Sequence, residues 1–168
     1  MFKGPAGFGR FNLAVNVLTA CIVLGFAIPL VFEAFTGIAI LSPGSYAATF
    51  ALTYCCGYTG GDLIPSAMWA QKLSDALKVK SGAARYVINA VIIGGVMGTI
   101  ILFLAGFVNN FAEGGFGAVW DFFSLLWLPC VVVSIVEVLV VSGVITKMAI
   151  SVSGFNPANA PAETPPEL

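Results

Sequence analysis

The chain has 168 residues, of which 59% are hydrophobic and only 9% are charged, and its mean hydropathy is +1.00. So few polar residues cannot cover the surface of a soluble domain of this length, which excludes an ordinary soluble protein and favours an integral membrane protein. The formal net charge of −1 lacks the basic excess typical of nucleic-acid-binding proteins, so we expect no nucleic acid partner.

Four apolar runs are each long enough to cross a bilayer, whose hydrocarbon core needs about 20 helical residues. In chain order we predict transmembrane helices over residues 11–35, 46–65, 86–108 and 120–146. Between the second and third runs, residues 66–80 begin with Ser66 as an N-cap and carry an apolar stripe, which predicts a helix along the membrane interface. Residues 152–168 are rich in proline and predict a disordered cytoplasmic tail.

The basic residues indicate how the chain is oriented. All seven lie on the same side of the predicted spans: Lys3, Arg10, Lys72, Lys78, Lys80, Arg85 and Lys147. Because cytoplasmic loops carry the excess of Lys and Arg, we expect a multi-pass protein of the inner (plasma) membrane with both termini in the cytoplasm. The loops that hold Glu33 and Glu113 then face outward.

The second and fourth predicted spans carry the same polar pattern, 75 residues apart. One runs from Cys55 through Thr59 to Asp62 with Lys72 ten residues on, and the other has Cys130, Ser134, Glu137 and Lys147. The matches predict a tandem repeat of a two-helix hairpin, residues 1–76 and 77–151. Because each unit crosses the membrane twice, the two hairpins should have the same orientation and be related by a pseudo-two-fold axis along the membrane normal.

The two acids are the best candidates for function. Each lies ten residues from its Lys, so a rise of 1.5 Å per residue places the carboxyl group roughly 15 Å from the cytoplasmic anchor. An ionised carboxylate at that depth costs several kcal/mol, so the group should be neutral, paired or facing a wet cavity. Thr59 and Ser134 precede the acids on the same helical face, and the Tyr58 hydroxyl lies one turn before Asp62, so all three can donate hydrogen bonds.

Two interpretations of these acids stay open. In the first, Asp62 and Glu137 take up and release a proton or cation while the two halves rock. In the second, each acid is a structural hydrogen-bonding residue that holds helices together. Because Asp62 lies among Gly57, Gly60 and Gly61 and before Pro65, we expect a bent or locally unwound segment there, which makes Asp62 the better candidate ligand.

Several classes of chemistry are not indicated. The chain has no histidine, its four cysteines form no C-x-x-C pair, and it contains no phosphate loop or nucleophile elbow. We therefore predict that the protein is not an enzyme and uses no metal or cofactor. The small residues Gly94, Gly95 and Gly98 predict close contact of the third span with another helix.

The tandem hairpins open with Arg10 and Arg85, and the first closes with Asp62-Leu-Ile-Pro65 and Ala70-Gln71-Lys72-Leu73. In these features the chain resembles a family of small, uncharacterised bacterial membrane proteins built from repeated transmembrane pairs, which implies the architecture but supplies no function. The architecture is also similar to the proteobacterial antimicrobial compound efflux transporters, which are proton-coupled four-helix proteins. Their first helix carries an Arg followed by a His and an acid, and neither follows Arg10 here.

The predicted fold is thus an all-α membrane protein, with four transmembrane helices as two parallel-oriented helical-hairpin repeats. The leading function is a proton- or cation-linked small-molecule transporter or channel-like protein. The alternative is a non-transporting structural or accessory subunit. The expected partners are the lipid bilayer and further copies of the chain or other membrane subunits, since four helices alone enclose little room.

Overall fold

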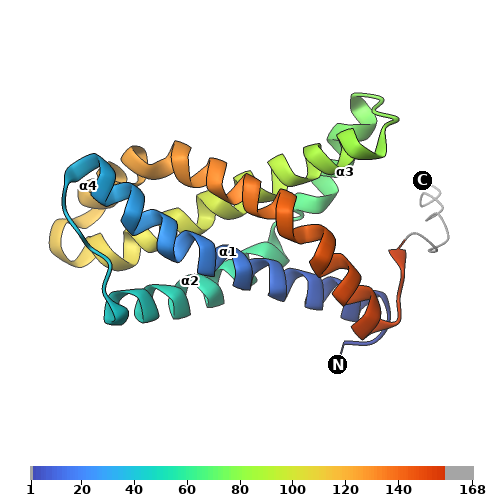
Figure 1. Cartoon of the computed structure of the whole chain (residues 1–168), viewed down its shortest axis with the longest axis horizontal. Coiled ribbons are helices and arrows are strands. Elements are labelled where there is room, and N and C mark those ends of the chain that lie inside the picture. Colours follow the sequence, from blue (N-terminus) through green and yellow to red (C-terminus); the bar gives the residue numbers. More distant parts are fainter. Residues whose placement is uncertain (1, 158–168) are drawn as a thin grey trace.

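The computed structural model describes residues 2–157, and all of their regular structure is helical (Figure 1). The helices are α1 (Gly4–Thr36), α2 (Pro43–Leu63), α3 (Ser66–Ala76) and α4 (Gly82–Ser153). The first predicted span lies within α1, and the second overlaps α2 and extends two residues past its C-terminal end. The third and fourth predicted spans both lie within the single helix α4. Of the predicted tail, residues 152 and 153 belong to α4 and residues 158–168 lie outside the described residues.

The long helix α4 folds back on itself at one glycine. Gly115 has φ 62° and ψ −157°, a conformation that is essentially open only to glycine. We call residues 82–114 the first arm and residues 116–153 the second arm. The arms pack antiparallel, since the Tyr86 hydroxyl donates to the Leu139 carbonyl at 2.7 Å and Trp127 Nε1 donates to Thr99 Oγ1 at 3.1 Å. The loop that was predicted to hold Glu113 is therefore helical except around Gly115.

Helices α1 and α2 form a second antiparallel pair. Along this pair Gly25 faces Tyr46, Gly57 faces Val17 and Gly61 faces Leu13. The helix α1 ends at Gly37, which has a positive φ, and α2 begins at a capping box between Ser42 and Ser45. The connection of this pair and the bend at Gly115 lie at the same end of the bundle (Figure 1).

The two ends of the bundle differ in charge. At one end the rings of Phe8 and Phe155 lie 5.9 Å apart, so the first and last described turns meet there. All seven Lys and Arg residues occur at or near this end, which we call the basic end. The opposite end, which carries the Gly115 bend, holds Glu33, Glu113 and Asp121, and we call it the acidic end.

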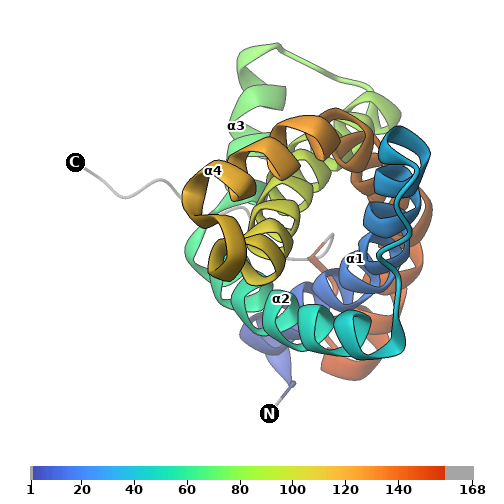
Figure 2. The same ribbon diagram turned by 90° about the vertical axis from the view of Figure 1, so that its left-hand side faces the viewer.

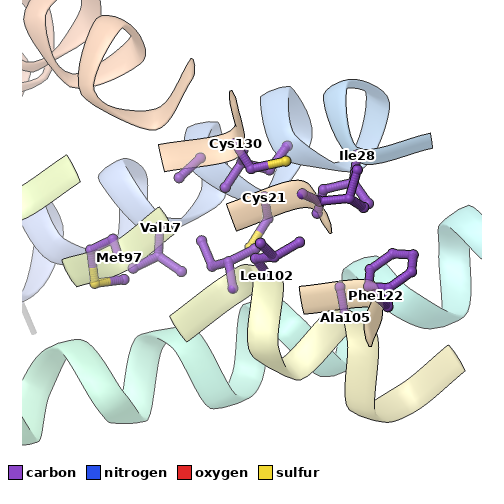
Figure 3. Packing of buried hydrophobic residues seen from close by; sticks show 12 residues of the cluster. Val17, Cys21, Ile28, Met97, Leu102, Ala105, Phe122 and Cys130 are labelled. Carbon is purple, nitrogen blue, oxygen red and sulfur yellow. The ribbon is translucent and has the colours of Figure 1, made fainter. Parts of the chain in front are cut away.

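The buried core is built by α1 and the two arms of α4. Cys21 and Leu24 of α1 pack with Leu102 of the first arm and with Leu126 and Cys130 of the second (Figure 3). From α2, by contrast, only Thr53 and Gly57 are buried. The helix α2 therefore lies against the outside of a core that the other helices supply.

Two helices, α1 and α4, are long and apolar enough to cross a membrane. At 72 residues α4 greatly exceeds the length of one crossing, and its fold at Gly115 divides it into two arms that are each longer than one crossing needs. The 21-residue α2 does not reach the same hydropathy, because glycines, hydroxyl side chains and Asp62 interrupt its apolar residues.

Candidate functional site

Glu137 is the most unusual side chain in the core. It projects from the second arm, is only 6% exposed, and neither carboxyl oxygen has a hydrogen-bond partner within residues 2–157. Buried polar groups in folded proteins almost always have a partner, and leaving one without costs about 1–3 kcal/mol. An orphaned carboxyl group therefore calls for a ligand or a function that offsets this cost.

Glycines of the first arm explain why this part of the second arm is buried. A Cβ atom at Gly94 would lie 2.7 Å from Ile135 Cα, and one at Gly98 would lie 2.8 Å from Ser134 Cβ. The missing side chains allow the two arms to approach closely, as small residues do between membrane helices. Ser134 is completely buried by this contact, and its hydroxyl also has no partner in the described part of the chain.

The polar neighbour of Glu137 on α1 is already occupied. Thr19 lies beside the Glu137 carboxyl group, but its hydroxyl donates to the backbone of its own helix, with Oγ1 at 3.1 Å from the Val15 carbonyl oxygen and 3.0 Å from that of Asn16. The site thus has a donor within reach that is not used in this conformation.

Glu137 also forms part of the wall of a groove on the outside of the bundle. The groove has a volume of about 380 Å³, and valines make up the rest of its lining: Val23, Val132, Val133, Val136, Val140 and Val141. Several of these valines are widely exposed, Val140 to 70%. Glu137 is therefore the only polar residue among those that line the groove, and its two carboxyl oxygens are buried beneath the groove surface.

The matching residues of α2 lie in a different environment. Asp62 and Thr59 are exposed, and the Thr59 hydroxyl donates to the Cys55 carbonyl at 3.0 Å within its own helix. Tyr58 is partly buried and packs at the edge of the core. Of the predicted bent or locally unwound segment at Asp62, the unwound alternative was wrong, since α2 stays helical to Leu63 and the chain leaves the helix only at Ile64.

The acidic end contains a pocket that the sequence analysis did not find. It has a volume of about 300 Å³, and its lining comes from α1, α2 and both arms of α4 near the end of the bundle that faces the viewer in Figure 2. Its polar lining comes from Ser45, Thr49, Asn109, Asn110 and Glu113. Aromatic rings of Phe32, Tyr46 and Phe122 complete the wall, and Asn109 Nδ2 donates to Thr49 Oγ1 at 3.0 Å, which ties the first arm to α2. The adjacent amides at 109 and 110 were the sequence signal for this pocket.

A layer of core side chains separates this pocket from Glu137. Ile28 and Phe122 belong both to the pocket and to the core (Figure 3). Cys21, which precedes Ile28 in α1, lies near Glu137. Leu24, Leu102 and Leu126 fill the space between and are fully buried. The pocket and the buried acid are thus two separate polar regions with an apolar layer between them.

Nothing in the described residues indicates a metal site. Within residues 2–157 no three Cys, Asp or Glu side chains come close enough together to hold an ion, and the four cysteines are unpaired. Cys21 and Cys130 are buried, and Cys55 and Cys56 are exposed.

No protein-family model, curated protein or solved structure matches this chain.

Proposed function

We propose that this chain is a four-pass membrane protein that carries out proton- or cation-linked transport of a small molecule, or acts as a channel-like protein, with Glu137 as its ionisable centre. The observation that carries the proposal is the burial of Glu137 with both oxygens unpartnered. A carboxyl group inside a membrane helix is costly and usually marks an ion pathway or a proton relay. A structural acid would instead be found with its hydrogen-bond partner in place.

A membrane location is supported by the outer surface of the helices. Large apolar side chains are exposed along both arms, including Phe116 at 66%, Leu128 at 64% and Val140 at 70%. Such an extended apolar surface is unfavourable in water and suits contact with lipid. The charge difference between the ends supports an orientation with the basic end in the cytoplasm.

The pocket at the acidic end gives such a protein a place for the transported molecule. In the proposed orientation this pocket opens outward, while the layer around Leu24, Leu102 and Leu126 closes the route to Glu137. Transport then requires the hairpin of α1 and α2 to move against the hairpin formed by the two arms. Two hairpin repeats of the same orientation would rock about an axis along the membrane normal.

A second candidate is an accessory subunit, and the groove beside Glu137 favours it. The groove faces the outside of the bundle, where a helix of a second copy or of another membrane protein could pack, and a turn of the Glu137 side chain would carry its buried carboxyl oxygens to a donor on that helix. In that case the carboxyl group completes its hydrogen bonds at an interface. Transport and assembly make different demands on Glu137, so one set of experiments distinguishes them.

The test is ion flux in proteoliposomes. The purified protein is reconstituted with a pH-sensitive dye inside, a pH step is imposed outside, and the wild type is compared with Glu137→Gln and with the control Glu33→Gln, an exposed acid at the acidic end. We expect flux from the wild type and the control but not from Glu137→Gln, because an amide cannot exchange a proton.

The oligomeric state of each variant is measured in parallel by light scattering. If Glu137→Gln dissociates an oligomer that the control retains, the accessory-subunit function replaces transport. If Glu137→Gln keeps both the wild-type flux and the wild-type oligomer, the site proposed at Glu137 is rejected.

A further inference from the structure

The short helix α3 does not follow the direction of the bundle. It begins at Ser66, directly after Pro65, and projects from the side of the bundle at the basic end, at a steep angle to the long axis (Figures 1 and 2). One side of α3 packs on α4, where Ala70 and Ser74 are buried. If the long axis of the bundle is normal to the membrane, α3 lies close to the plane of the membrane surface.

Arg85 at the start of α4 holds α3 in this position. Its Nη2 donates to Asp75 Oδ1 at 2.7 Å and its Nε donates to the Val79 carbonyl at 2.8 Å. The Val79 amide in turn donates to the Ser74 carbonyl at 3.0 Å. These bonds anchor the end of α3 and the turn that follows it, so the outer face of α3 has a defined direction.

That outer face is apolar although it is not covered by the rest of the chain. Met68, Trp69 and Leu73 are 44%, 47% and 40% exposed. At about 100° per residue Met68 and Trp69 lie on the side of the helix away from Ala70 and Ser74, and Leu73 lies on the flank between Trp69 and Ala70. Because α3 packs on α4 with one side and exposes large apolar side chains on another, the exposed side chains favour contact with a second apolar surface.

Lysines without a salt-bridge partner in the described part of the chain lie on this face and in the segment that follows α3. Lys72 lies on it between Met68 and Trp69 when viewed down the helix, and Lys78 and Lys80 follow in the next turn. Within residues 2–157 the only salt bridge joins Arg85 to Asp75, so the local acid is neutralised by a different cation. The three lysines therefore leave a net positive charge beside the exposed rings and methyl groups.

We propose that the outer face of α3 is a binding site for acidic phospholipids at the cytoplasmic surface of the bilayer. The apolar side chains enter the region between headgroups and acyl chains, Trp69 lies at the depth typical of interfacial tryptophans, and the lysines contact the phosphates of anionic headgroups. A protein partner fits less well, because a lysine in the centre of the apolar face would have to be desolvated, whereas at a membrane it extends to the headgroups. This site is independent of any transport through Glu137.

Brominated lipids test this site directly, because bromine quenches a nearby tryptophan. In a Trp120→Phe/Trp127→Phe background, Trp69 is the only tryptophan. The protein is placed in nanodiscs of phosphatidylcholine that contain a fixed fraction of either phosphatidylglycerol or phosphatidylcholine brominated near the headgroup. We expect stronger quenching by the brominated phosphatidylglycerol, and a weaker preference in 0.5 M salt because of screening.

Two matched pairs of substitutions show whether α3 supplies the preference. Lys72→Gln/Lys80→Gln should weaken the preference for phosphatidylglycerol by up to about fivefold per lysine. Lys3→Gln/Lys147→Gln makes the same change in charge at the same end and should leave the preference intact. Lys78 is not changed, because it has a positive φ of 52° and closes the turn after α3.

Four results would overturn the proposal. The first is equal quenching by both lipids, and the second is an equal loss of preference in both substitution pairs, which would indicate bulk charge rather than a site. The third is a Trp69 that neither lipid quenches, which would indicate that protein covers this face. A preference abolished by soluble glycerol phosphate would likewise assign the site to a free anion and not to a lipid.

Discussion

Asp62 and Glu137 occupy equivalent places in two similar stretches of sequence, yet the first is exposed and the second is buried without a partner. Both acids follow a Cys and a hydroxyl residue at the same spacing, and both precede a Lys by ten residues. The hydroxyls also differ, since Thr59 bonds to its own backbone and Ser134 bonds to no described residue. Equal spacing along a helix thus leads to opposite surroundings.

The difference arises from the helices that pack against the two acids. The second arm lies between α1 and the first arm, whose Gly94 and Gly98 let Ser134 and its neighbours approach very closely. The helix α2 presents its own glycines to its neighbours, so that Gly57 and Gly61 face Val17 and Leu13 while Asp62 points away from the core. Which helix supplies the glycines therefore decides which polar side chain is buried.

The largest expected effect is on ion flux and separates the two acids. Glu137→Gln should lower the rate by about tenfold or more, since the exchangeable proton is lost at the buried centre. Asp62→Asn should keep most of the flux because its carboxylate is exposed to the surroundings. The pH-step assay in proteoliposomes measures both, and a larger loss from Asp62→Asn would reverse the comparison in favour of α2.

The next effect is on stability and concerns the glycines of the first arm. Gly94→Ala should lower the free energy of unfolding by about 1–3 kcal/mol, because the new Cβ would lie 2.7 Å from backbone atoms of Ile135. Gly95→Ala is the matched control, since no atom lies within 4 Å of its Cβ position, and it should raise stability by about 0.5–1 kcal/mol. Unfolding in detergent, followed by circular dichroism, measures both. Equal effects would mean that the arms do not depend on close approach.

A third prediction uses the missing hydrogen bonds of Glu137. Glu137→Leu should raise the free energy of unfolding by about 1–3 kcal/mol while it abolishes flux, because it removes a buried polar group that has no partner. Asp62→Leu should change stability little, since Asp62 is exposed. Thermal unfolding of the two variants is the measurement. A destabilised Glu137→Leu protein would show that the carboxyl group makes structural contacts.

The smallest effect concerns the two hydroxyl residues. Ser134→Ala should be neutral or stabilising by about 1 kcal/mol or less, because its buried hydroxyl bonds to no described residue. Thr59→Val should stay within about 0.5 kcal/mol of the wild type, as expected for an exposed helical position. The same unfolding assay applies. A clear loss of stability in Ser134→Ala would reveal a hydrogen bond in solution that holds the arms together.

The sequence allowed the helices to be predicted but not all of their ends. Apolar runs and the stripe of residues 66–80 were sufficient to locate every helix, because these patterns are local. A connection between the last two spans was predicted, but the residue at which the chain reverses was not. Residues 109–119 contain three glycines, and only the tertiary fold selects Gly115 as the one that takes a positive φ. The pocket at the acidic end was missed because its polar residues come from α2 and the first arm, which are far apart in the sequence.

The sequence by itself determined the helical architecture, the separation of basic and acidic ends and the presence of two acids in apolar surroundings. These properties follow from composition and from the distribution of charge along the chain. Only the tertiary structure decided that Glu137 is enclosed and that Asp62 is not. Helical spacing states which residues share a face, whereas burial depends on how closely another helix approaches that face, and here the glycines of the first arm control that distance.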